Sequence, residues 1–158
     1  MKVVAVSGTP GTGKTKIAKL IAKKIDANYI DVNNFIKKNK LYIGYDRRFK
    51  SYNVNLNKLV DYLIRLIKSS KENLIIDSHL SHYIPKRYVN LCIITKCDLK
   101  KLKKRLEKRG YSKRKVRENL DAEIFDVCLM EALINKHKVR IIDTSKKINI
   151  KQLLRYIK

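Results

Sequence analysis

Near its N-terminus the chain carries the stretch Gly8-Thr9-Pro10-Gly11-Thr12-Gly13-Lys14-Thr15, which is the most informative part of the sequence for its fold. It matches the pattern G-x-x-x-x-G-K-[ST] without a mismatch, and it lies between an apolar run at 2–6 and an amphipathic stretch at 14–25. The glycines let backbone N–H groups turn inward around a phosphate, and the N-terminus of the following helix adds positive potential there. Lys14 can reach the β- and γ-phosphate oxygens, and the Thr15 hydroxyl can hold Mg²⁺. The motif therefore predicts that the chain binds a nucleoside triphosphate.

Outward from this loop, strand patterns and helix patterns alternate along the chain. We expect strands at 2–6, 28–32, 73–77, 91–95 and 139–142, and helices at 14–25, 55–69, 98–109 and 148–157. A long helix is expected after Ser112, with the apolar stripe Val116, Leu120, Ile124, Val127 and Leu133. The stretch 33–52 reads as irregular. This alternation predicts an α/β fold with a parallel sheet covered on both faces and a ligand site at the carboxyl ends of the strands.

Composition favours one folded domain over 1–158. Of the 158 residues, 44% are hydrophobic and 33% are charged, which is typical of neither a disordered nor a membrane protein. Apolar runs reach only four or five residues, so none can span a bilayer and no membrane partner is expected. The three cysteines include no CxxC pair, which excludes a disulfide framework and a thiolate zinc site. We expect buried thiols and a cytoplasmic protein.

The charge balance is strongly positive. Lys and Arg number 38 against 14 Asp and Glu, a formal net charge of +24. Such a field attracts polyanions and makes their binding dependent on salt. A composition rich in Lys, Asn and Ile can also follow from AT-rich codons, although that bias would raise Glu as well. A polyanionic partner beyond the nucleotide is the favoured interpretation.

An acidic residue and two histidines follow the third predicted strand. Asp77 ends the apolar run 74–76, resembles a Walker B carboxylate, and would orient Mg²⁺ directly or through water. His79 follows on the turn, where an imidazole could position a water or a phosphoryl oxygen. The spacing of Asp77, His79 and His82 also admits zinc, which would need a fourth ligand. A structural role is the favoured interpretation for His82 and His137.

A basic segment follows the fourth predicted strand. The 22 residues from Lys96 to Arg117 hold twelve Lys or Arg and two acids. Arg105 and Arg109 share one helix face, and Gly110 is expected to end that helix. A hinge flanked by guanidinium groups suits a lid that closes over a triphosphate and neutralises charge. We therefore expect Arg109 to act on the nucleotide and most of the lysines to form a solvated face.

Four stretches resemble the adenylate kinase isoenzyme 6 family, also called coilin-interacting nuclear ATPase. They are the loop 8–15; Leu41-Tyr42-Ile43-Gly44-Tyr45-Asp46; Asp77-Ser78-His79; and Arg105-Leu106-Glu107-Lys108-Arg109-Gly110-Tyr111-Ser112, which continues through Glu118-Asn119 to Glu123-Ile124-Phe125 and Glu131-Ala132. Together they span most of the chain in the family's order. The Arg-Gly-Tyr lid followed by Glu-Asn and Glu-Ile-Phe is far more specific than the loop.

The resemblance implies a P-loop three-layer sandwich with five parallel strands, an NMP-binding segment at about 31–54 and a short lid at about 108–118. It implies phosphoryl transfer from ATP to AMP or another nucleoside monophosphate, with intrinsic ATPase activity. It further implies a role in maturing small-subunit rRNA, with that rRNA and a small-subunit ribosomal protein as partners. Carried over by position, it assigns ATP binding to Gly11, Gly13, Lys14, Thr15, Lys16 and Arg109, Mg²⁺ to Thr15 and Asp77, and catalysis to Lys14, Asp77, His79 and Arg109.

Several residues depart from the family's pattern. Lys16 stands where a small hydroxyl residue is more frequent, and the basic stretch Arg47-Arg48-Phe49-Lys50 is acidic in eukaryotic relatives. Lys37 stands where relatives can carry an arginine for the monophosphate. Because a lysine offers a point charge in place of a bidentate fork, acceptor binding is expected to be weaker. Arg87 resembles the arginine that many adenylate kinases aim at AMP.

Three functions remain open. The leading one is a nucleoside monophosphate kinase that converts ATP and AMP to two ADP. The second is an ATPase that times release from pre-ribosomal particles, which the positive charge favours. The third is a kinase for another acceptor such as shikimate, suggested by Asp31 after the second strand, although Asn33 replaces the second expected acid. No long apolar heptad predicts a dimer, so a monomer is expected.

Overall fold

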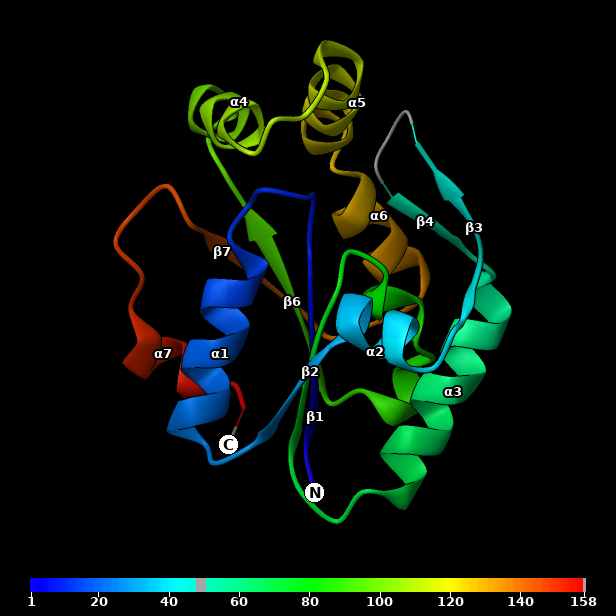
Figure 1. Cartoon of the computed structure of the whole chain (residues 1–158). Helices are drawn as coiled ribbons and strands as arrows, with labels where there is room; N and C mark the ends of the chain where they lie inside the picture. Colours follow the sequence, from blue (N-terminus) through cyan, green and yellow to red (C-terminus); the bar gives the residue numbers. More distant parts are fainter. Residues whose placement is uncertain (48–50, 158) are drawn as a thin grey trace.

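A five-stranded parallel sheet forms the centre of the molecule (Figure 1). The structure, a computed structural model, describes residues 1–47 and 51–157, so Arg48, Phe49 and Lys50 of the basic stretch lie outside the described residues. The strand order is β2 (Asn28–Asp31), β5 (Leu74–Asp77), β1 (Val3–Ser7), β6 (Leu91–Lys96) and β7 (Val139–Asp143). The predicted α/β fold with five parallel strands is confirmed, and each strand lies within two residues of its expected bounds.

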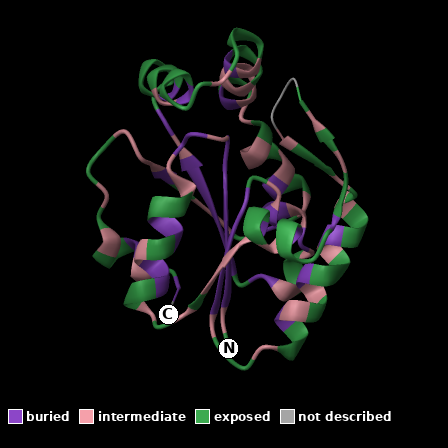
Figure 2. Ribbon diagram, viewed as in Figure 1, coloured by how far each residue is buried: buried purple, intermediate pink, exposed green. Residues whose placement is uncertain are grey.

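The central strands are apolar throughout because helices cover both faces of the sheet. Helices α1 (Lys14–Lys24) and α7 (Ile150–Arg155) pack on one face, and α2 (Val32–Lys38), α3 (Leu56–Ser69) and α6 (Val127–Ile134) pack on the other. Figure 2 shows the buried residues concentrated in the strands and along the inner sides of these helices. Two apolar cores result, one on each face, and they hold the carboxyl ends of the strands in fixed register.

A third, smaller core lies above those carboxyl ends. It joins α4 (Leu99–Lys108) to α5 (Lys113–Ile124) through Leu102, Leu106 and Val116. As expected, α4 begins after the capping residue Asp98, whose side chain accepts a hydrogen bond from the backbone N–H of Lys101. Gly110, at φ +70°, directs the chain from α4 towards α5. Figure 1 shows this pair of helices over the end of the sheet opposite the two termini.

The single long helix expected after Ser112 is wrong, because the chain forms α5 and α6 with a sharp turn between them. Asp126 adopts a left-handed conformation at φ +53°, and Phe125 is 71% exposed. The Lys96 ammonium binds the Asp126 carboxylate and also donates a hydrogen bond to the backbone oxygen of Glu123 at 2.9 Å. The break lets α5 stay with α4 while α6 packs on the sheet, which leaves Ile124 exposed instead of in a buried stripe.

The expectation of irregular structure at 33–52 is also wrong over most of the described part. Asp31 caps α2 by accepting hydrogen bonds from the backbone N–H groups of Asn33 and Asn34. An antiparallel hairpin of β3 (Tyr42–Asp46) and β4 (Ser51–Val54) follows. Its tyrosines favour strand structure, but its exposed faces give no alternating apolar pattern in the sequence. Short 3₁₀ turns at Ser81–Tyr83 and Lys86–Tyr88 complete the fold.

Among the described helices, none is long and apolar enough to cross a membrane.

Substitution of Gly8 tests how closely the phosphate loop packs against β6. Gly8 has φ +135°, and a Cβ there would lie 2.5 Å from the backbone oxygen of Thr95. We expect Gly8→Ala to lower the free energy of unfolding by more than about 2 kcal/mol, because both strain and a clash oppose it. Gly110→Ala is the control: φ is +70° with no atom within 4 Å, so about 1 kcal/mol is expected. Equal urea midpoints for the two variants would contradict this account.

Candidate active site

The conformation of the phosphate loop is fixed by hydroxyl side chains from the loop itself and from two other segments. It follows β1, and Gly13 ends it at φ +95° as the first residue before α1. The Thr12 hydroxyl donates to the backbone oxygen of Thr9 at 2.7 Å and pairs with the Thr95 hydroxyl at 2.7 Å. The Thr144 hydroxyl donates to the backbone oxygen of Thr12 at 2.5 Å. These bonds fix the loop's backbone in the shape that a bound phosphate needs.

Lys14 and Thr15 lie at the first turn of α1, where the loop ends. The Lys14 ammonium donates to the backbone oxygen of Thr9 at 3.0 Å, a contact that phosphate oxygens could replace. Burial lowers the pKa of Lys14 to about 8, and the Asp77 carboxylate offsets only part of this effect. The Thr15 hydroxyl donates to Asp77 Oδ2 at 2.7 Å. The structure thus brings together three residues that the sequence singled out.

Asp77 carries a second hydrogen bond that the sequence reasoning missed. The Tyr29 hydroxyl donates to Asp77 Oδ2 at 2.8 Å, the same oxygen that receives the Thr15 hydroxyl. Tyr29 lies on β2, the neighbour of β5, and no motif marks it. Because Asp77 is nearly buried, two donors on one oxygen leave its other oxygen as the freer acceptor. Tyr29 therefore fixes the orientation of the carboxylate.

The oxygen donors at this point suit Mg²⁺. Magnesium prefers hard oxygen ligands, keeps several waters, and takes one or two protein oxygens beside substrate phosphates. The Thr15 hydroxyl and the Asp77 carboxylate supply such oxygens beside the loop. Within 1–47 and 51–157, no group of three or more His, Cys, Asp or Glu could hold a metal ion by itself. The residues present fit a metal that is completed by phosphate and water.

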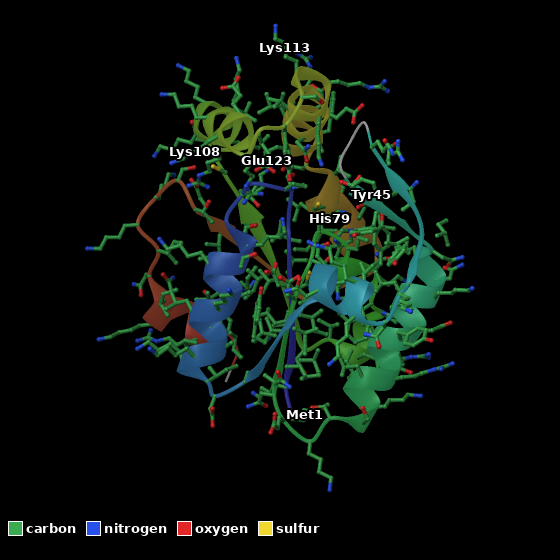
Figure 3. All side chains as sticks on the ribbon, viewed as in Figure 1. Met1, Tyr45, His79, Lys108, Lys113 and Glu123 are labelled. Carbon is green, nitrogen blue, oxygen red and sulfur yellow. The ribbon has the colours of Figure 1, made fainter. Side chains whose placement is uncertain are left out.

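The two histidines after β5 lie in different environments. His79, labelled in Figure 3, follows β5 at the turn. The residue is exposed, yet desolvation of the ring by the surrounding protein, together with the Lys14 ammonium, lowers the pKa of His79 to about 4. His79 is therefore neutral at pH 7. His82 is fully buried, with Nδ1 2.7 Å from the Ser7 hydroxyl and Nε2 2.8 Å from a Glu131 oxygen. Both nitrogens of His82 are used, so the structural role favoured for it is the one the structure shows.

An open cavity of about 900 Å³ adjoins the loop between α1, α4 and the segment after β7. Its apolar walls come from Ile17, Leu20, Ile148 and Ile150, and its cations from Lys16, Arg105, Lys108, Arg109, Lys146 and Lys147. Arg109 therefore lies on the wall of this cavity. Arg105 donates to the backbone oxygen of Gly11 at 3.3 Å and so braces the loop. The segment 144–150 was missed because its residues are nearly 130 or more positions from the loop and carry no motif.

The structure does not bring Arg87 to this site. Arg87 lies in the turn that precedes β6, and the start of a parallel strand is at the opposite end of the sheet from the loop. Its guanidinium lies 5.0 Å from the ring centre of Tyr88. The proposed AMP contact of Arg87 is therefore wrong. Lys37, the other candidate, lies on α2 with its ammonium 5.6 Å from the ring centre of Tyr52.

Comparisons with known proteins agree with this geometry. Residues 4–126 match the family described as AAA domain. The chain is 40% identical, over 91% of its length and 77% of the relative, to a Methanocaldococcus jannaschii protein named "Putative adenylate kinase". It is 39% identical, over 82% of its length and 73% of the relative, to a Schizosaccharomyces pombe protein named adenylate kinase isoenzyme 6 homolog.

The fold is also found among solved kinases. A deoxyadenosine kinase from M. mycoides with bound dATP superposes with a TM-score of 0.58, covering 98% of each chain at 16% identity. At this identity the likeness supports the fold alone. A kinase-type function is supported by the names of the relatives.

A Tyr29→Phe substitution tests the second hydrogen bond to Asp77. Removing this hydrogen bond loosens the carboxylate and should weaken Mg²⁺ binding. We therefore expect the Mg²⁺ concentration needed for nucleoside triphosphate binding to rise roughly tenfold, with little change in the free energy of unfolding. The measurement is calorimetric titration with nucleotide at increasing Mg²⁺. Tyr83→Phe is the matched control, since it removes a 2.7 Å hydrogen bond to Glu131. An unchanged Mg²⁺ requirement in Tyr29→Phe would show that Tyr29 does not orient the carboxylate.

The lowered pKa of Lys14 predicts a pH effect on substrate capture. Below about 8 the ammonium is charged and attracts phosphate, whereas above that value the free protein loses this charge. We expect kcat/KM for the triphosphate to fall about tenfold per pH unit above that point. In Lys14→Arg the guanidinium stays charged, so the fall should disappear even if activity is low. A flat wild-type profile up to pH 10 would refute the assignment.

Proposed function

The chain belongs to the adenylate kinase isoenzyme 6 family, and from this we propose that it transfers the terminal phosphoryl group of ATP to AMP. The relatives' names support a kinase that acts on nucleotides. The observation that carries the proposal is the convergence of Lys14, Thr15 and Asp77 at the end of the phosphate loop. Such a set serves phosphoryl transfer, in which positioning and charge supply most of the catalysis.

In the proposed reaction, the bond between the γ-phosphorus and the oxygen that bridges to the β-phosphate breaks. A new bond to an AMP phosphate oxygen forms, and two ADP result. Lys14 would bind the β- and γ-oxygens after releasing the backbone oxygen of Thr9. Arg109, on the cavity wall, would add a second cation, and Thr15 and Asp77 would hold Mg²⁺. When bound, Mg²⁺ supplies further neutralisation of phosphate charge.

The remaining site residues have supporting roles in this proposal. Gly11 and Gly13 give the loop its positive φ angles, so that its N–H groups face the phosphates. Lys16 lines the cavity beside the loop. His79, neutral at pH 7, would position a phosphoryl oxygen, or a water in an intrinsic ATPase reaction. No general base is required for transfer to a phosphate oxygen, which is already ionised.

The proposal assigns roles to two larger segments of one domain. The acceptor segment is about 31–54, which contains α2 and the β3–β4 hairpin, and the lid is about 108–118, at the α4–α5 junction. Arg109 and Gly110 lie at that junction, and both are exposed. A hinge there would move α5 relative to the cavity without disturbing the sheet.

A second proposed function is an ATPase that acts in small-subunit rRNA maturation. The net charge of +24 supports a polyanionic partner such as rRNA, and a small-subunit ribosomal protein is the further proposed partner. A cytoplasmic monomer is part of this proposal. It is supported by the free thiols, of which Cys92 and Cys97 are buried. The two functions are compatible, because both begin with ATP binding at the same loop.

The first experiment is ADP production from ATP and Mg²⁺ with and without AMP. We expect AMP-dependent formation of two ADP per ATP, and a loss of at least about a hundredfold in Lys14→Met, because a preorganised cation on the transferred group is removed. Shikimate in place of AMP tests the third interpretation, and no turnover is expected. Phosphate release that ignores AMP would overturn the kinase and leave the ATPase. Full activity in Lys14→Met would overturn both.

A further inference from the structure

Three tyrosines on one face of the β3–β4 hairpin form an exposed aromatic surface. Tyr42, Tyr45 and Tyr52 are 41%, 51% and 39% exposed. The ring centres of Tyr42 and Tyr52 are 4.8 Å apart, and those of Tyr45 and Tyr52 are 5.1 Å apart. The rings are tilted by 40° and 64°, so they do not cover one another fully. We call these three residues the tyrosine face.

The tyrosine face is not explained by packing. Tyr45 pairs directly with Tyr52 across the hairpin, which places both rings on one side. The adjacent core includes Val54 and Phe35 but none of the three tyrosines. Figure 3 shows Tyr45 on the hairpin, at the end of the molecule where the carboxyl ends of the strands lie. Exposed clustered aromatic rings of this kind mark a binding surface more often than a structural feature.

One cation contacts the tyrosine face, and others are close to it in the sequence. The Lys37 ammonium lies 5.6 Å from the ring centre of Tyr52. Lys38 and Lys40 follow at the end of α2, Arg47 follows β3, and all three are exposed. Within β3 and β4, Asp46 is the one acidic residue. Aromatic rings bordered by cations are the combination that binds the bases and the phosphates of a flexible strand together.

We propose that the tyrosine face binds single-stranded nucleic acid, with bases stacked on the tyrosines and Lys37 at the backbone phosphates. Three rings in succession suit a strand of several nucleotides, whereas a free mononucleotide would use one ring within an enclosed pocket. The excess of cations over the whole chain draws in a polyanion and opposes a second copy of this protein. The inference gives the proposed rRNA partner its contact surface and rests on that second proposed function, not on phosphoryl transfer.

The test is binding of a fluorescent oligoadenylate of about 12 nucleotides to the full chain at fixed salt. The variant Tyr45→Ala/Tyr52→Ala removes two stacking rings, so we expect at least about tenfold weaker binding. Tyr62→Ala is the matched control, because Tyr62 is equally exposed, at 39%, on α3 and should leave binding unchanged. Tyr45→Phe/Tyr52→Phe should retain it, because stacking needs the ring and not the hydroxyl.

Two further arms separate base stacking from other causes. Polyglutamate of similar charge should bind the wild-type chain and the Tyr45→Ala/Tyr52→Ala variant with equal affinity, because it has no bases to stack. If Tyr45→Ala/Tyr52→Ala weakened the binding of polyglutamate as much as the binding of oligoadenylate, the proposal would be overturned in favour of an acidic protein partner. An unchanged oligoadenylate affinity with a raised KM for AMP would also overturn it and assign the face to the acceptor. AMP-dependent turnover measured on the same preparations shows separately whether the kinase proposal holds.

Discussion

The phosphate loop must keep its backbone N–H groups turned inward before any phosphate arrives, and much of the structure serves that constraint. Gly8, Gly11 and Gly13 adopt positive φ angles that side chains oppose. Hydroxyl groups from β6 and from the segment after β7 then bind Thr12 and hold the loop in place. Because these bonds lie within the protein itself, the fold contributes to organising the loop.

Electrostatic balance at the loop follows from where the strands end. The carboxyl ends of β1 and β5 are neighbours in register, which places Asp77 within hydrogen-bond distance of the Thr15 hydroxyl. Its negative charge offsets part of the cost of burying Lys14, and burial still keeps that lysine easier to deprotonate than in water. A bound polyphosphate would restore the full charge of the lysine. The site is therefore poised for an anionic ligand.

A buried polar network connects the loop to the helices above it. His82 links the Ser7 hydroxyl, one residue before the loop, to Glu131 on α6, and Tyr83 binds the other oxygen of that carboxylate. At the other end of α6, Lys96 holds the turn that separates α5 from α6. The turn therefore lets α5 pack on α4 while α6 packs on the sheet.

Local spacing and backbone chemistry were enough to predict the alternation of strands and helices, the phosphate loop and the helix capped by Asp98. The same local patterns pointed to Lys14, Thr15, Asp77 and Arg109 as candidate site residues. Periodicity misjudged 33–52 and the α5–α6 break, since exposed tyrosines hide a hairpin and a left-handed Asp126 interrupts a continuous apolar stripe. The three-dimensional arrangement was needed to show that Tyr29 and Thr144 join the site and that Arg87 does not. Those assignments depend on which strand ends are neighbours, and residues over a hundred positions apart meet there without any local signal in the sequence.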